Sequence, residues 1–247
     1  IALMAAALLV AGGCTAASSN GFTRETAPRA EAMSLLGQPL FAPVIPEEAR
    51  ARMEEQLAEA RANYERNPDD ADAIIWLGRR LAYLGYYRDA IRVFGEGIHK
   101  HPDDARMYRH RGHRYITTRQ VSRAVADLET AARLMADRPD EVEPDGQPNS
   151  YGIPTSTLKS NIWYHLALAH YLRHDFESAL AAWRTAVDTA DNDDMLVASS
   201  DWLYMTLRRL GQDAVLVPGD VPGDRDHELL VDTRERKDAR ARLADSV

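Results

Sequence analysis

Cysteine is almost absent from this chain of 247 residues, which contains only Cys14. A single cysteine forms no disulfide within the chain, so a disulfide scaffold and a cysteine-rich zinc site are excluded. Basic residues are also in the minority, 30 against 38 acidic ones, for a formal net charge of -8. Because general nucleic-acid binding usually needs a basic surface, we expect no nucleic-acid partner.

Several motifs of enzymes are missing as well. The chain has no glycine-rich phosphate loop, no dinucleotide-binding glycine motif, no GxSxG and no HExxH. It also has no apolar run of about 18 residues, the length that a membrane-spanning helix needs. The remaining composition, 45% hydrophobic and 28% charged, is that of a folded protein. We therefore expect a folded chain with no enzyme activity and no cofactor.

The first residues have the pattern of an export signal. Residues 1–10 form a short apolar run, and the small residues Ala11, Gly12 and Gly13 separate it from Cys14. This resembles a bacterial lipoprotein signal peptide, which implies cleavage after residue 13, lipidation of Cys14 and attachment to a membrane through the lipid. Thr15 follows the cysteine in place of the Asp that is usual for inner-membrane retention. The resemblance thus implies the cell envelope, at the outer membrane facing the periplasm; a plain secretory signal cut after Ala17 is the alternative.

The segment between Cys14 and the main body is not expected to be helical. Residues 15–30 are small and polar, as in a flexible tether. Residues 35–46 are apolar but contain three prolines, which disfavour both a helix and a central strand. We assign 14–45 to a tether and an extended segment that docks on the folded body.

The body contains an internal repeat. Asn67-Pro68-Asp69-Asp70-Ala71 recurs 34 residues later as His101-Pro102-Asp103-Asp104-Ala105. The same offset relates Gly78 to Gly112, Ala90 to Ala124 and Phe94 to Leu128, and a third copy with Ala167, Ala179 and Trp183 follows after an insert. Small residues at two of these columns allow two helices to approach closely, while the large third column fills the space between units. The paired aspartates are expected to cap helices rather than to bind calcium.

This period and pattern resemble the tetratricopeptide repeat, a helix-turn-helix unit. The resemblance implies an all-α fold, a right-handed superhelical solenoid with capping helices. The expected divisions are a capping helix at 46–66, an array at 67–217 with repeats 71–104, 105–138, 160–193 and a partial 194–217, an insert at 139–159, and a linker and charged tail at 218–247.

The second repeat is strongly basic. Six arginines and two histidines lie between Arg106 and Arg123, and no acid occurs from Ala105 to Ala126. Tetratricopeptide arrays bind ligands on the concave face, formed by the first helix of each unit. By that resemblance, the groove residues are expected to be Ile75, Arg79, Arg106, Arg109, His113, Asn161, Tyr164 and Leu168. Because arginine suits carboxylates, the expected ligand is an acidic or C-terminal peptide segment of another protein.

A structural explanation of the arginines is open beside this one. Arg111 replaces an apolar residue of its column, so it should be partly buried and need a partner. The insert contains Asp140, Glu141, Glu143 and Asp145, and we expect some of these acids to pair with the arginine helix. The histidine pairs His110/His113 and His170/His174 lie one helical turn apart, but a functional metal site is not expected from them.

These patterns favour a protein-interaction scaffold of the bacterial cell envelope. The alternative is a structural subunit of an outer-membrane assembly or secretion complex. A hydrolase or a metal-binding protein is less favoured, because neither has a motif in this sequence.

Overall fold

The computed structural model describes residues 29–144 and 156–212. Several expectations lie outside these ranges: the signal peptide at 1–13, lipidation of Cys14, the first part of the tether, any role of Asp145, and the linker and tail at 218–247. The end of the partial fourth repeat, residues 213–217, lies outside them too.

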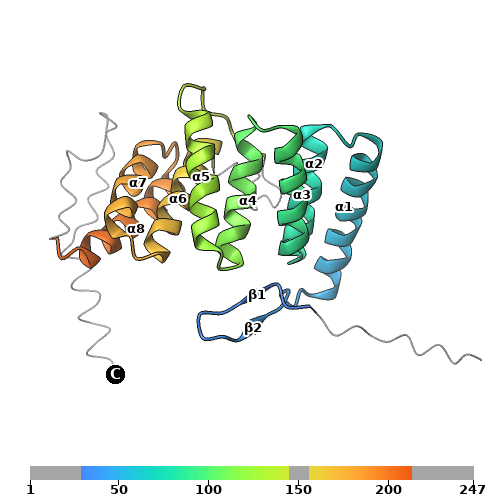
Figure 1. Ribbon diagram of the computed structural model, residues 1–247, viewed down its shortest axis with the longest axis horizontal. Helices are drawn as coiled ribbons and strands as arrows, with labels where there is room; N and C mark the ends of the chain where they lie inside the picture. The colour runs from blue at the N-terminus through green and yellow to red at the C-terminus, as the bar shows by residue number, and fades with distance from the viewer. Residues whose placement is uncertain (1–28, 145–155, 213–247) are drawn as a thin grey trace, which may run out of the picture.

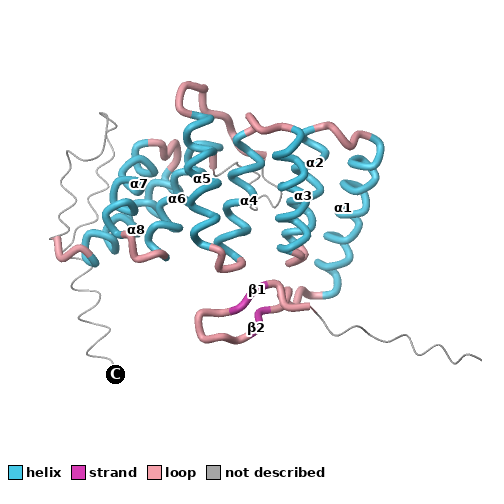
Figure 2. The backbone as a smooth tube through the Cα atoms, viewed as in Figure 1, coloured by secondary structure: helices cyan, strands magenta, loops and turns pink. Residues whose placement is uncertain are grey.

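The described ranges are 69% helical, which confirms the all-α prediction (Figures 1 and 2). The helices are α1 (Glu47–Arg66), α2 (Ala71–Tyr83), α3 (Tyr87–Lys100), α4 (Ala105–Thr117), α5 (Val121–Met135), α6 (Leu158–Leu172), α7 (Phe176–Asp188) and α8 (Asp193–Arg209). One small antiparallel hairpin, β1 (Ala32–Met33) and β2 (Pro39–Leu40), precedes them.

The aspartates of the repeated turn cap helices, as predicted. The Asp70 carboxylate accepts a hydrogen bond of 2.7 Å from the backbone N–H of Ala73 at the start of α2. The Asp104 carboxylate accepts one of 3.0 Å from the N–H of Arg106 at the start of α4. These bonds satisfy N–H groups that have no partner within the helix. The repeated turn therefore sets where the first helix begins in the first two units.

The helices form two layers. Each helix packs on its neighbour in the chain, and α4 also contacts α2 and α6, while α6 also contacts α8. The helices α2, α4, α6 and α8 thus lie side by side in one layer, and α3, α5 and α7 form the other layer (Figure 1). This layer of first helices is the face on which the sequence places the groove.

The small and large columns of the repeat meet in the core. Ala90, Ala124 and Ala179 are completely buried, and so is Trp183. In the second unit a Cβ atom on Gly112 would lie only 2.8 Å from Cγ of Leu128. Only a small residue fits at this position of the repeat, because a large side chain from the second helix of the unit packs directly against it.

We predict that Gly112→Ala destabilises the protein by about 1–3 kcal/mol, because the added methyl group collides with a buried leucine. Gly95→Ala is the matched control: the nearest atom to its Cβ would be Nη1 of Arg111 at 3.4 Å. Because alanine has a higher helix propensity than glycine, that variant should be more stable than the wild type by up to about 1 kcal/mol. The measurement is urea unfolding followed by circular dichroism, and equal midpoints for both variants would contradict the packing argument.

The third unit begins two residues before the boundary at 160. Helix α6 starts at Leu158 because Thr157 and Ser160 form a capping box, in which each side chain bonds the backbone N–H of the other. The last two residues of the expected insert therefore belong to the helix.

The apolar segment before α1 forms a hairpin that lies at one end of the helices (Figure 1). The carboxylate of Glu31 accepts a hydrogen bond of 2.8 Å from the N–H of Arg88, which connects the hairpin to α3. At its tip, Leu35 and Leu36 are 90% and 88% exposed. Within the described ranges, no helix combines the length and apolar character that crossing a membrane requires.

Candidate functional site

A polar cavity of about 200 Å³ lies on the face made by the first helices. Its walls come from α2, α3, α4 and the insert between α5 and α6. The lining residues are Arg79, Ala82, Tyr83, Phe94, Arg109, His110, His113, Arg114, Glu143, Pro144 and Ser156.

The insert is fixed in place where it meets the cavity. Val142 and Thr157 form an isolated antiparallel bridge, and the N–H of Glu143 donates to the carbonyl of Ser156 at 3.1 Å. The Asp140 carboxylate accepts hydrogen bonds from Thr157 Oγ1 at 2.6 Å and from the N–H of Lys159 at 2.9 Å. The chain of the insert is thus joined to the start of α6 on both sides of Glu143.

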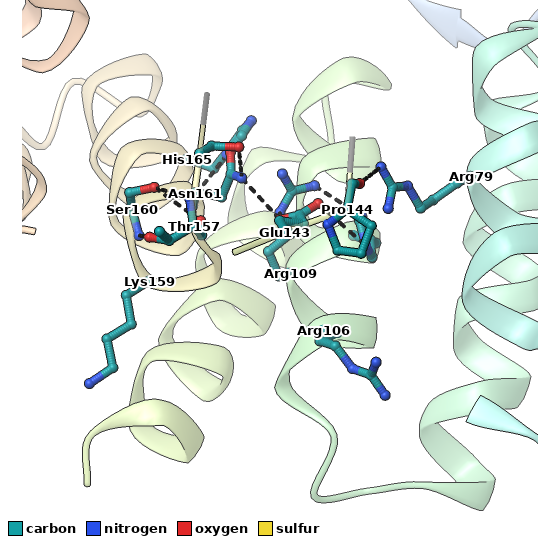
Figure 3. Close-up of polar contacts among 12 residues, drawn as sticks. Arg79, Arg106, Arg109, Glu143, Pro144, Thr157, Lys159, Ser160, Asn161 and His165 are labelled. Carbon is teal, nitrogen blue, oxygen red and sulfur yellow. Dashed lines mark hydrogen bonds and ion pairs between the residues drawn. The ribbon is translucent and has the colours of Figure 1, made fainter. Parts of the chain in front are cut away.

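Glu143 forms the centre of the polar contacts (Figure 3). Its carboxylate lies 3.0 Å from Nε of Arg109 and accepts a hydrogen bond of 2.9 Å from Nδ2 of Asn161. His110 Nε2 lies 3.6 Å from the other carboxylate oxygen. The expectation that an acid of the insert pairs with the arginine helix is therefore confirmed, with Glu143 as that acid.

Arg79 contacts the next residue of the insert. Its guanidinium donates a hydrogen bond of 2.6 Å to the carbonyl of Pro144 and one of 3.0 Å to the hydroxyl of Tyr83. The same group lies over the Trp76 ring, 4.4 Å from its centroid. The side chain is therefore held rigidly at the edge of the cavity.

Arg114 has no such acidic or carbonyl partner in the part of the chain that the structure describes. It is partly buried, and its guanidinium lies over the ring of Tyr87 at 5.5 Å from the centroid. Burial, together with the positive charge of Arg109, lowers the pKa of Arg114 to about 10. The lowered pKa indicates that the charge of this residue is poorly compensated.

Three histidines around the cavity are neutral at pH 7. Burial lowers the pKa of His110 and of His113 well below the usual 6.5, and nearby positive charges add to the effect. Burial and Arg109 lower the pKa of His165 to about 3, and its ring lies 4.1 Å from that of His113, between centroids. No group of three or more His, Cys, Asp or Glu side chains within 29–144 and 156–212 is arranged to hold a metal ion.

The charges of the cavity do not balance. Its lining contains three arginines, Arg79, Arg109 and Arg114, and one carboxylate, Glu143. Since the histidines are neutral, the described lining has a surplus of two positive charges. Positive charges removed from water need compensation, so this arrangement favours an anionic ligand.

Comparisons with known proteins agree with this architecture. No protein-family model and no curated protein matches the sequence. Among solved structures, MamA from Desulfovibrio magneticus RS-1 (residues 41 to the end) aligns with a TM-score of 0.51 and 20% identity, over 66% of this chain and 79% of that one. Another crystal structure of MamA has a TM-score of 0.51 and 12% identity, over 68% of this chain and 87% of that one. The fold is of the tetratricopeptide-repeat type.

Four of the expected groove residues lie at the cavity of this tetratricopeptide-repeat array or contact Glu143. Arg79, Arg109 and His113 line the cavity, and Asn161 bonds Glu143 from α6. Arg106 differs: it pairs with Asp104 at 2.6 Å and with Asp72 at 2.7 Å, away from Glu143 (Figure 3). The hydrogen bond to Asp104 raises the pKa of Arg106 above its usual range. Arg106 therefore does not lie at the cavity but forms an ion pair that joins the first two repeats.

The three apolar residues of the expected groove belong mainly to the core. Ile75 is only 5% exposed and packs, together with Ile74, in the hydrophobic core of the first repeat. Tyr164 packs against Trp183 and accepts a hydrogen bond of 3.0 Å from Nε1 of Trp202. Leu168 is partly buried against the same later core. None of these three lines the cavity.

Arg111 is partly buried with an acidic partner, as expected, but the partner is not in the insert. It forms two hydrogen bonds, of 2.7 and 2.8 Å, with the carboxylate of Asp127 on α5. Helices α4 and α5 belong to one unit, so this pair lies inside the second repeat.

Sequence reasoning missed Tyr83, Arg114 and His165. Arg114 lies four residues after His110 and could have been found from the helical spacing of the basic residues. His165 lies on another helix, and no local pattern connects it with His113.

Proposed function

We propose that this protein is a protein-interaction scaffold that binds an acidic or C-terminal segment of a partner on its concave face. One observation carries the proposal: the face already holds a short acidic segment of its own chain. Arg109 and Asn161 hold the carboxylate of Glu143, and Arg79 holds the carbonyl of Pro144. Groups of this kind recognise an extended acidic peptide through its side chain and its backbone together.

The same proposal places the protein in the bacterial cell envelope, with a lipid on Cys14. It is supported by the apolar run and the small residues before that cysteine. Two or more acyl chains bind a membrane stably, since each buried CH₂ contributes about 0.8 kcal/mol. The array would then present its concave face to partners near the membrane surface.

Photo-crosslinking in cells tests the binding face. A benzoylphenylalanine in place of Tyr83, a half-buried aromatic residue of α2 that lines the cavity, should crosslink a partner that mass spectrometry identifies. The matched position is Glu129, which is exposed on α5 of the other layer and should not capture that partner. Crosslinks from Glu129 alone, or from neither position, would refute binding on the concave face.

A structural subunit of an envelope complex is the second candidate. The exposed apolar tip at Leu35 and Leu36 favours it, because exposed apolar groups of this kind often mark a contact with another molecule. In that case the crosslinked partner would remain bound throughout purification, whereas a scaffold would release it on dilution.

A further inference from the structure

The cavity contains positive charge that the described residues do not neutralise. Glu143 compensates Arg109 at 3.0 Å, and Arg79 donates to a carbonyl and a hydroxyl, which are uncharged. Arg114 lines the same cavity and has no carboxylate within ion-pair distance among the described residues. A cluster of this kind costs stability, and a protein that retains it generally uses it for binding.

Glu143 does not move easily to serve Arg114. The bridge between Val142 and Thr157 holds the backbone on one side, and Asp140 bonds the first turn of α6. The carboxylate itself is bound to both α4 and α6. Glu143 is therefore a fixed wall of the cavity, and among the described residues no second carboxylate lies within ion-pair distance of Arg114.

The size of the cavity limits what that molecule can place there. About 200 Å³ is several times the roughly 30 Å³ that a water molecule occupies in the liquid. A carboxylate or a phosphate group fits, whereas a folded element does not. The donors are also suitable: arginine forks suit flat or tetrahedral oxyanions, and the Tyr83 hydroxyl and the neutral ring of His113 can donate as well.

We propose that the cavity binds one compact oxyanion, a carboxylate or a phosphate group, between Arg114 and Arg109 and beside a Glu143 that stays in place. Arg114 is the principal ligand, and Arg79 and Tyr83 close the side formed by α2. The inference rests on the proposed function only for the source of the group, which on that function is an acidic side chain or the C-terminus of a partner.

Thermal unfolding of the full chain with simple probes tests the site. Inorganic phosphate and succinate are each added at millimolar concentration, with sodium chloride at equal ionic strength as the reference. Binding to the folded state raises the melting temperature by mass action, and we expect a rise of several degrees with at least one probe. Phosphate alone would identify a phosphate-bearing ligand, and succinate alone a carboxylate; no rise with either would overturn the proposal.

Arg114→Gln separates binding from structure. Because Arg114 is an uncompensated charge, its removal should leave the melting temperature without probe unchanged or higher, and should abolish the rise caused by the probe. Arg133→Gln, at an exposed arginine of α5, is the matched control and should keep the full rise. A lower melting temperature without probe, or a rise that survives in Arg114→Gln, would show that Arg114 has a structural role and overturn the site.

The two proposals can fail separately. Probe binding that needs Arg114, with no partner crosslinked from position 83, would leave the oxyanion site standing and refute the scaffold. A partner crosslinked from position 83, with no probe binding, would do the reverse.

Discussion

Lowering the pH from about 6.5 to 5 should destabilise the protein steeply. Three histidines at the cavity, His110, His113 and His165, have a folded-state pKa below the usual 6.5 because they are buried near arginines. The unfolded chain therefore binds these protons first, and stability falls as the pH falls through 6.5 toward the folded pKa. His165, with its pKa lowered to about 3, stays neutral and costs about 2 kcal/mol at pH 5, and His110 and His113 add to this loss.

Most of the groups around the three histidines act in this direction. Arg109 and Arg114 of α4 lower the pKa of His165, and only the carbonyl of Asn161, bonded to Nδ1 at 2.6 Å, opposes them. Glu143 lies nearest to His110, but burial and the arginines dominate there.

Urea unfolding at a series of pH values measures the effect. Between pH 5 and 6.5, the slope of the unfolding free energy against pH should correspond to about one proton less in His165→Gln than in the wild type. The control is His99→Gln, at an exposed histidine of α3, which should keep the wild-type slope. A stability that does not change over this range would show that the histidines are not buried neutral groups.

Glu143→Ala should destabilise the protein by about 3–5 kcal/mol, because it leaves the buried charge of Arg109 without its carboxylate. The Glu143 side chain is only 10% exposed, and that of Arg109 only 9%. Glu141→Ala is the matched control: it lies in the same segment with an exposed side chain, and its backbone carbonyl still accepts from Leu158. We expect that control to stay within about 0.5 kcal/mol of the wild type.

Chemical denaturation at pH 7.5 measures both variants, and a double variant tests the cause. Arg109→Met with Glu143→Ala removes both charges and should recover part of the loss, since a buried pair is often replaceable by apolar groups. A double variant less stable than Glu143→Ala alone would show that the loss comes from the insert's backbone rather than from an unpaired charge.

The repeat made the fold predictable. A period of 34 residues with small residues at Gly78, Gly112 and Ala167 indicates closely packed helix pairs, and the repeated aspartates define where α2 and α4 start. These are local rules that repeat along the chain, so the sequence expresses them several times. The hairpin of β1 and β2 is not part of the repeat. From the sequence alone, its two paired strands could not be distinguished from an extended segment without strand pairing.

The site was predictable in part. An acid-free stretch of arginines in an acidic chain indicated that acids from elsewhere would pair with it, and Glu143 does. Which arginine pairs with the insert could not be predicted from the sequence. Arg106 pairs instead with Asp72 of the previous repeat, and Arg111 pairs with Asp127 of its own repeat. Arg114 is left without such a partner by the way in which the helices pack.

The sequence by itself determined the helical array, its period and the basic character of the second unit, because helix spacing and capping are local properties of the chain. Only the tertiary structure decided that the insert returns Glu143 to the inner layer and that His165 meets His113 across two helices. It also decided that Arg114 lines a cavity with surplus positive charge. These contacts join segments that are far apart in the chain. They form only once the repeats have stacked, because burial and ion pairing then bring the segments together.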